Sequence, residues 1–211
     1  SRVRARVISH ALAGLIEESD VVVAMGHQFL DMDALGASLG FVSAAKALGK
    51  PSFAVLTPGQ NPSVDSLLEF LIKDDDVKGV FLNEQETLDK MTKKSLLVVV
   101  DTHRPSFSLS AKVLEKAEKV VVIDHHRRGE EFIDKALLVY LEPYASSTGE
   151  MVTEILQYIS DDIKIPPSVA TALLAGMAVD TRNFSFKTGV RTFEAASSLR
   201  RAGGCSFKSP N

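Results

Sequence analysis

Apolar residues alternate along the chain between two spacings, one typical of buried strands and one typical of helices. Continuous apolar runs fall within 21–25, 96–100 and 119–123, and such runs predict strands buried on both faces, as in a parallel sheet. Weaker strand patterns cover 52–56, 78–82 and 137–141. Helical spacing predicts helices at 3–18, 34–48, 64–72, 84–91, 110–116, 147–159, 168–179 and 190–202. This alternation predicts an α/β fold with a parallel-dominated sheet and helices on both faces.

Local signals fix several of the predicted helix ends. Ser147 and Glu150 have the spacing of a capping box, in which each side chain bonds the other residue's backbone N–H. Pro166 and Pro167 suit the first turn of the next helix. The many small residues of 34–48 predict that this helix lies close to the sheet.

Composition narrows the class of protein. With 211 residues and 45% hydrophobic content, the chain can bury a sizeable core. Its formal net charge of −3 excludes a global positive field, so we expect no binding to long nucleic acids. The single cysteine excludes an internal disulfide. The sequence has no apolar run long enough for a membrane span and no signal-peptide core at its start, so we expect no membrane contact.

Acids and imidazoles follow three of the predicted strands. Four of the five histidines lie at these strand ends, and only His10 does not. The carboxyl ends of parallel strands share one edge of the sheet, so we expect these side chains to converge there. Asp180, at a helix end, would oppose the helix dipole unless a cation lies nearby. The strand-end groups are His27, Asp31 and Asp33, then Asp101, then Asp124, His125 and His126.

This donor set points to a metal centre. Carboxylates and imidazoles without thiolates suit Mn²⁺, Mg²⁺, Fe²⁺ or Zn²⁺. Several acids at one edge would repel each other, so one divalent ion is the minimum, and a pair could activate water for phosphoester hydrolysis. The alternative is that these residues only cap strands and turns.

The same residues resemble four motifs of the DHH phosphoesterase superfamily, in order and over residues 21–202. The motifs are His27-xxx-Asp31-x-Asp33, Asp101-Thr102-His103, Asp124-His125-His126 and Asp180-Thr181-xx-Phe184. Met32, the Asp101–Ser106 stretch and the Glu142–Thr148 stretch are similar to cyclic-di-AMP phosphodiesterases of the GdpP type. The RecJ-like exonucleases and nanoRNases of the superfamily more often carry Gly at the position of Met32.

The resemblance implies a role for each site residue. It implies two Mn²⁺ ions bridged by Asp101, with Asp124 orienting imidazole rings and His126 facing the substrate phosphate. His103 and Arg104 would contact phosphate, although Arg104 could equally form a rigid turn. Ser146, Ser147 and Thr148 would offer a helix N-terminus to an anion, in competition with helix capping, and Arg127 and Arg128 would be solvated. One ion would be held by His27, Asp31 and Asp101, and the other by Asp33, Asp101, His125 and Asp180.

The resemblance also implies an activity and a setting. We expect a DHH catalytic domain at 1–202, and at 203–211 a tail or the start of a linker to a C-terminal substrate-binding domain, without which activity would be weak. The implied reaction is metal-dependent hydrolysis of cyclic di-AMP to 5′-pApA. Alternatives are hydrolysis of short linear oligonucleotides or of pApA, or a sensor that binds a dinucleotide without turnover. The parent protein would be membrane-anchored, with this domain in the cytoplasm, and a homodimer is compatible.

Overall fold

Six parallel strands form one sheet at the centre of the molecule. The computed structural model describes residues 2–59, 61–160 and 164–208, so the last three residues of the predicted tail lie outside the described part. The strand order is β3-β2-β1-β4-β5-β6, so the winding direction reverses between β1 and β4, where open α/β sheets place their ligands. The strands are β1 Val22–Met25, β2 Ser52–Val55, β3 Phe81–Leu82, β4 Leu96–Val100, β5 Lys119–Asp124 and β6 Leu138–Leu141.

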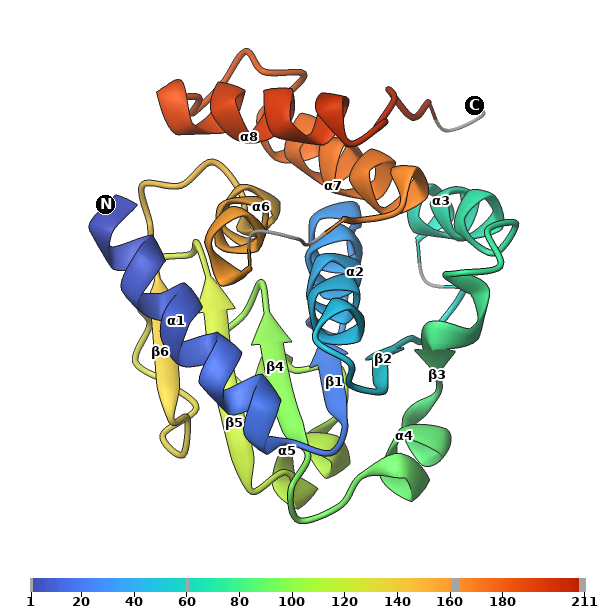
Figure 1. Cartoon of the computed structure of the whole chain (residues 1–211), viewed down its shortest axis with the longest axis vertical. Coiled ribbons are helices and arrows are strands. Elements are labelled where there is room, and N and C mark those ends of the chain that lie inside the picture. Colours follow the sequence, from blue (N-terminus) through green and yellow to red (C-terminus); the bar gives the residue numbers. More distant parts are fainter. Residues whose placement is uncertain (1, 60, 161–163, 209–211) are drawn as a thin grey trace.

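Helices cover both faces of this sheet, which confirms the predicted α/β class. Alternate residues of β4 belong to different apolar clusters: Leu96 and Val98 face α1, α2 and α6, whereas Leu97 and Val99 face α5. Figure 1 shows α1, α2 and α6 in front of the sheet and α7 with α8 together at the top of the view. The helices are α1 Arg2–Glu18, α2 Met32–Ala47, α3 Pro62–Leu71, α4 Glu84–Lys90, α5 Ala111–Lys116, α6 Thr148–Ile159, α7 Pro167–Asp180 and α8 Val190–Arg201.

Two glycines bring α2 and α7 into backbone contact. A Cβ atom on Gly36 would lie 2.8 Å from the carbonyl oxygen of Ala172, and one on Gly176 would lie 2.6 Å from the Cα of Asp33. The small residues of α2 predict a close approach to the sheet, and the structure adds a close approach of α2 to α7 at Gly36 and Gly176. This contact holds Asp33, in the first turn of α2, beside the last turn of α7, which ends at Asp180.

Two local predictions differ from the structure. The predicted strand at 78–82 begins with a 3₁₀ turn, Lys78–Val80, and only Phe81–Leu82 pairs with β2 at the edge of the sheet. Ser147 caps α6 by accepting a hydrogen bond from the Glu150 N–H at 3.1 Å. The Glu150 carboxylate, however, accepts bonds from the hydroxyls of Ser146 and Thr192, and therefore links α6 to α8 rather than closing a capping box.

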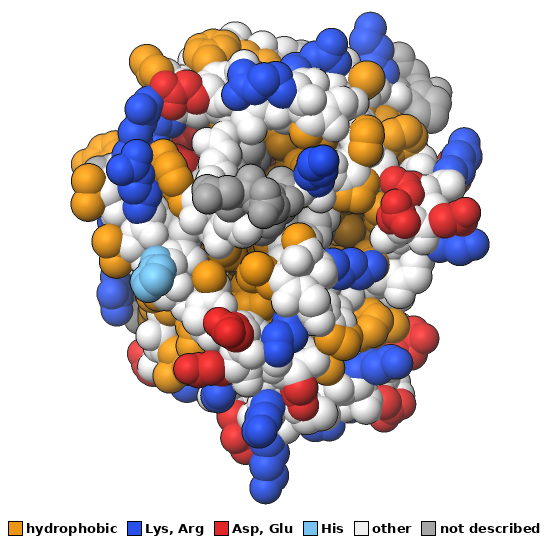
Figure 2. Space-filling model, viewed as in Figure 1, with side chains coloured by type: hydrophobic (Ala, Val, Ile, Leu, Met, Phe, Trp, Pro, Cys, Tyr) orange, Lys and Arg blue, Asp and Glu red, His pale blue; other side chains and the backbone are white. Residues whose placement is uncertain are grey.

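The surface agrees with the small net charge. On the face shown in Figure 2, acidic and basic side chains are interspersed with apolar ones. Within the described part of the chain, no helix combines the length and the apolar character that crossing a membrane requires.

Candidate metal centre

Hydrogen bonds hold the segment between β1 and α2 in place. Gln28 N–H donates a 2.7 Å hydrogen bond to the carbonyl of Phe107, which anchors the backbone next to His27. Asp31 is the N-cap of α2, and its Oδ1 accepts a hydrogen bond from Ala34 N–H at 2.8 Å. Since that bond uses one carboxylate oxygen, Oδ2 is left facing His27 Nε2 at 3.6 Å.

Asp101 turns the chain sharply at the end of β4. Its φ of +65° lies in the left-handed region, which costs a non-glycine residue roughly 1 kcal/mol and which Asp tolerates better than most residues. Its N–H still donates to the Ile123 carbonyl of β5 at 3.0 Å. The Asp101 carboxylate therefore lies at the centre of the sheet edge, where β1, β4 and β5 end side by side.

The structure brings all six predicted metal ligands together. Their ligand atoms fall into overlapping groups in which every atom lies within 4.8 Å of the others. One group combines His27, Asp31 and Asp101, and a second combines Asp33, His125 and Asp180, while Asp101 also forms a group with His125 and His126. Asp101 lies between the first two groups, since His27 Nε2 is 3.0 Å from its Oδ2 and His125 Nε2 is 3.4 Å from its Oδ1.

Asp33 is buried against the start of α6. Its two carboxylate oxygens accept hydrogen bonds from the backbone N–H groups of Thr148 at 2.9 Å and Gly149 at 2.7 Å. A Cβ atom on Gly149 would lie 3.0 Å from Asp33 Oδ1, so this approach requires glycine or a shift of the carboxylate. Burial, followed by the charges of Asp101, Asp180 and Asp31, raises the pKa of Asp33 well above its ordinary value. The helix N-terminus opposes that rise because its amides favour the anion.

The predicted substrate contacts at the start of α6 already have partners in the protein. Ser146, Ser147 and Thr148 are all buried, and the Thr148 hydroxyl donates a 2.9 Å hydrogen bond to Asp101 Oδ1. The hydroxyl of Ser146 donates to Glu150, and that of Ser147 accepts from Glu150 N–H. Thr148 therefore holds the predicted ligands Asp33 and Asp101, a role that the sequence does not predict, whereas Ser146 and Ser147 bond Glu150.

His27, His125 and Asp101 favour each other's charged forms. Burial lowers the pKa of His27, but its hydrogen bonds to Asp101 and Asp31 outweigh burial and raise the pKa to about 10. Burial also lowers the pKa of His125, but the nearby carboxylates of Asp101 and Asp180 outweigh burial and raise it to about 11. Burial raises the pKa of Asp101, but the adjacent rings of His125 and His27 hold it below its usual range.

The arrangement fits divalent cations. Nε2 of His125 is buried and lies 3.3 Å from Asp180, 3.4 Å from Asp101 and 3.8 Å from Asp33. It nevertheless has no partner with hydrogen-bond geometry among the described residues. A nitrogen aimed between carboxylates from three elements is placed as a metal ligand would be, and the mutual repulsion of these acids disappears when a cation neutralises them.

Asp124 joins two other histidines. Its Oδ2 accepts a 2.7 Å hydrogen bond from Nδ1 of His103, and its Oδ1 accepts one of 2.7 Å from Nδ1 of His126. Asp124 is buried, whereas the His126 side chain is 55% exposed and so remains accessible at the sheet edge. The hydrogen bond to Asp124 raises the pKa of His126. Asp124 thus orients His103 and His126, and the predicted ligand His125 lies between Asp124 and His126 in sequence.

The remaining predicted site residues, His103 and Arg104, lie in the loop after β4. His103 is 2% exposed, and its Nε2 accepts a 3.0 Å hydrogen bond from Gly129 N–H, so both ring nitrogens are engaged within the protein. Arg104 is half-exposed at the surface of this loop. Direct contact of His103 with a substrate stays a prediction, and its observed bonds position the loop that carries Arg127 and Arg128.

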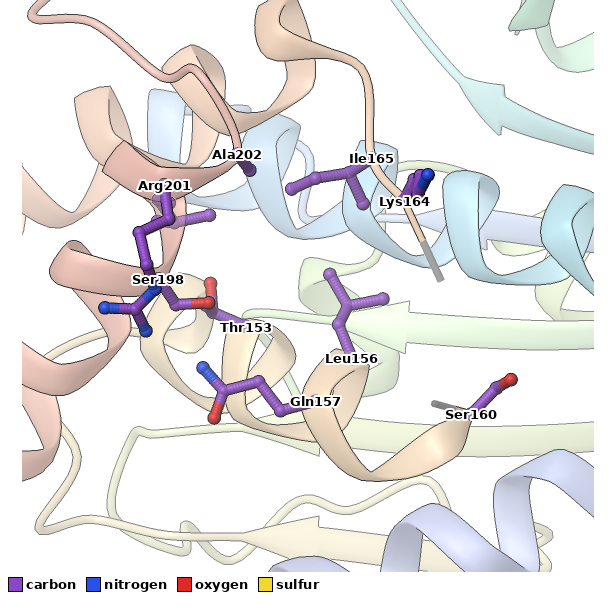
Figure 3. A pocket seen from close by; sticks show the side chains of 10 residues that line it. Thr153, Leu156, Gln157, Ser160, Lys164, Ile165, Ser198, Arg201 and Ala202 are labelled. Atoms are coloured by element: carbon purple, nitrogen blue, oxygen red, sulfur yellow. The ribbon is translucent and has the colours of Figure 1, made fainter. Parts of the chain in front are cut away.

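One cavity lies away from the predicted metal ligands. It has a volume of about 600 Å³ and lies between the C-terminal half of α6, α8 and residues 164–165, with Leu156, Lys164 and Arg201 in its wall (Figure 3). Leu156 is eight residues beyond Thr148 on the same helix, which corresponds to about 12 Å. None of the described residues that line this cavity is a predicted site residue.

The parallel sheet, with acids and histidines at its reversal point, defines the class of this protein: an α/β protein with an edge that could hold metal ions. Residues 21–177 match the family model described as "DHH family, N-terminal domain". The chain belongs to the DHH family.

Curated relatives cover nearly the whole chain. It is 50% identical over 204 residues to the cyclic-di-AMP phosphodiesterase GdpP of Bacillus subtilis and 48% identical to the cyclic-di-AMP phosphodiesterase PdeA of Listeria monocytogenes, in each case over 96% of the chain. The chain spans 31% of the length of these relatives.

A solved structure shares the fold. An exopolyphosphatase-related protein of Bacteroides fragilis superimposes with a TM-score of 0.76 at 21% identity, covering 93% of this chain and 57% of that one. At this identity the likeness shows the fold alone.

Proposed function

We propose that this chain is the catalytic domain of a metal-dependent phosphodiesterase that opens cyclic di-AMP to 5′-pApA. The observation that carries the proposal is the pair of ligand groups, His27/Asp31/Asp101 and Asp33/His125/Asp180, with Asp101 between them. The similarity to cyclic-di-AMP phosphodiesterases over 96% of the chain supports the choice of substrate.

The six ligands would hold two divalent ions, and Mn²⁺ suits their oxygen and nitrogen donors. When bound, such a pair activates a water and neutralises the charge of the phosphoryl oxygens. The protein residues keep the ligands in place: the α6 amides hold Asp33, and the Thr148 hydroxyl holds Asp101. Without these bonds the carboxylates could rotate away from their shared position.

His126 is the candidate for proton transfer. Nδ1 of His126 donates a hydrogen bond to Asp124, which leaves Nε2 as the position that can give a proton to a leaving oxygen. The raised pKa favours the protonated ring, which is the form that a general acid needs. In this proposal Asp124 contributes by orienting His126 and by stabilising its positive charge.

We propose that residues 1–202 form the catalytic domain and that 203–211 begin a linker to a substrate-binding domain. The parent protein would be anchored in the membrane, with this domain in the cytoplasm. Its partner would be a cyclic dinucleotide rather than a long nucleic acid, and the chain's charge of −3 supports that choice.

Comparison of three substrates tests the function. We would measure hydrolysis of cyclic di-AMP, pApA and a short RNA by the intact protein with Mn²⁺, and use His10→Ala, on the exposed face of α1, as the control variant. We expect cyclic di-AMP to give the highest kcat/KM and pApA to accumulate. Preferred turnover of the linear substrates would make the chain a nuclease or phosphatase, and tight binding without turnover would make it a sensor.

A further inference from the structure

Two arginines beside the candidate metal centre are held on aromatic rings. The guanidinium carbon of Arg104 lies 4.0 Å from the centroid of the Phe107 ring, and that of Arg128 lies 4.4 Å from the centroid of Phe132. A guanidinium over a ring loses rotational freedom but keeps its N–H donors at the edge of its plane. Among the described residues, the neighbouring Arg127 has no such aromatic contact.

The loops that carry these arginines are joined to each other. His103 accepts a hydrogen bond from Gly129 N–H at its Nε2, and its carbonyl accepts a second from Ile133 N–H, both at 3.0 Å. The His103 ring also stacks on Phe132 at a centroid distance of 5.2 Å. The Phe132 ring therefore contacts both the His103 ring and the Arg128 guanidinium. A Cβ atom on Gly129 would lie 4.0 Å from Cδ of Arg104.

Glu131 completes the connection between the loops. Its carboxylate accepts hydrogen bonds from the N–H and the hydroxyl of Ser106 at 2.6 and 2.7 Å, and Nη2 of Arg104 approaches it at 3.6 Å. These bonds lower the pKa of Glu131, chiefly through the Ser106 hydroxyl. The carboxylate is satisfied mainly by Ser106, and the 3.6 Å approach engages one edge of the Arg104 guanidinium.

Both arginines lie close to the reacting centre along the chain. Arg104 is three residues beyond Asp101 and Arg128 is two beyond His126, and the two loops leave the adjacent strands β4 and β5. Three residues span at most about 10 Å even when fully extended. The His103 ring also shares Asp124 with His126, which ties the arginine stack to the side chain that faces the substrate.

We propose that Arg104 and Arg128 form an anion subsite that binds the second, non-reacting phosphate of the dinucleotide, and that His103 positions this subsite. The inference rests on the proposed function. A cyclic dinucleotide carries two phosphodiesters one nucleotide apart, so a substrate held at the metal centre presents its other phosphate beside that centre. Paired guanidiniums are suited to bidentate phosphate recognition. The rigid stacking lowers the entropy that binding would otherwise cost.

Two substrates separate this role from support of the metal centre. We would compare cyclic di-AMP with bis(p-nitrophenyl) phosphate, which has one phosphodiester and no second phosphate, using the intact protein with Mn²⁺. The variants are Arg104→Gln and Arg128→Gln, with Arg127→Gln as the matched control. We expect each of the first two to raise KM for cyclic di-AMP at least tenfold and to change kcat/KM for the small diester less than twofold. The control should change neither.

Phe132→Leu tests the platform without removing a charge. It should raise KM for cyclic di-AMP severalfold, because Arg128 would lose its fixed orientation. Equal loss on both substrates in the arginine variants would assign them to the metal centre or to folding, and an unchanged KM would assign them to solvent; either result overturns the subsite. The wild-type protein reports separately on the proposed function, because its preference for cyclic di-AMP does not depend on the variants.

Discussion

Replacing Gly176 by alanine tests whether the contact between α2 and α7 sets the metal centre. A Cβ atom there would lie 2.6 Å from Asp33 Cα, 2.9 Å from the Met32 carbonyl oxygen and 3.0 Å from Asp33 N, all of them backbone atoms. Ordinary contact begins at 3.4 Å, so the helices must separate by about 0.8 Å. No rotamer change relieves a clash with backbone.

The expected cost follows from two opposing effects. Overpacking a tight contact costs about 1–3 kcal/mol, and the upper part of that range applies because both sides are backbone. The better helix propensity of alanine returns about 1 kcal/mol. We therefore expect a net loss of about 1–2 kcal/mol in the free energy of unfolding. The same shift moves Asp33 relative to Asp180, and since metal–ligand distances tolerate only about 0.2 Å, Mn²⁺ affinity should fall more than tenfold.

Gly14→Ala is the matched control. Gly14 also lies inside a helix, α1, and a Cβ atom there meets nothing within 4 Å. The Gly14→Ala variant should therefore gain about 1 kcal/mol in the free energy of unfolding from helix propensity alone. It should leave Mn²⁺ binding unchanged. Urea unfolding without metal measures the first quantity, and calorimetric Mn²⁺ titration measures the second. If Gly176→Ala behaves like Gly14→Ala in both assays, the steric reasoning is refuted.

Three further predictions concern the ligands. Asp101→Asn should abolish Mn²⁺-dependent hydrolysis and leave the circular dichroism spectrum unchanged. Near-normal activity would contradict the proposal that Asp101 bridges two metal ions. Thr148→Val should lower stability by about 1 kcal/mol in urea unfolding, because Asp101 loses a buried hydrogen bond; an unchanged midpoint would show that this bond is not needed. In EDTA, the raised pKa values of His27 and His125, about 10 and 11, favour protonated rings. The contribution of these two histidines to the free energy of unfolding is complete below pH 6.5, and it is lost as the pH rises through about 10 and 11. Mn²⁺ competes with these protons, so its affinity should rise between about pH 6 and 8, with proton release in calorimetry; no release would contradict the charge assignment.

The sequence by itself determined the strands and the set of side chains at their ends. Continuous apolar runs such as 96–100 fit only strands covered on both faces, and the carboxyl ends of parallel strands share one edge. This shared edge alone predicts that Asp101 and His125 lie close together, although they are far apart in the sequence. The motifs in that order identified the DHH family, which the match over residues 21–177 shows.

Only the tertiary structure decided which polar atom each ligand meets. Asp33 accepts a hydrogen bond from the N–H of Thr148, 115 residues away, and no local sequence pattern predicts that pairing. The tight approach at Gly176 likewise depends on two helices that are separated by the whole middle of the chain. The place of His103 after Asp101 predicts a phosphate contact, and only the structure shows that its two ring nitrogens bond Asp124 and Gly129. Sequence patterns report periodicity and burial, whereas hydrogen-bond partners depend on the distance and direction between elements, and these are set when the layers pack.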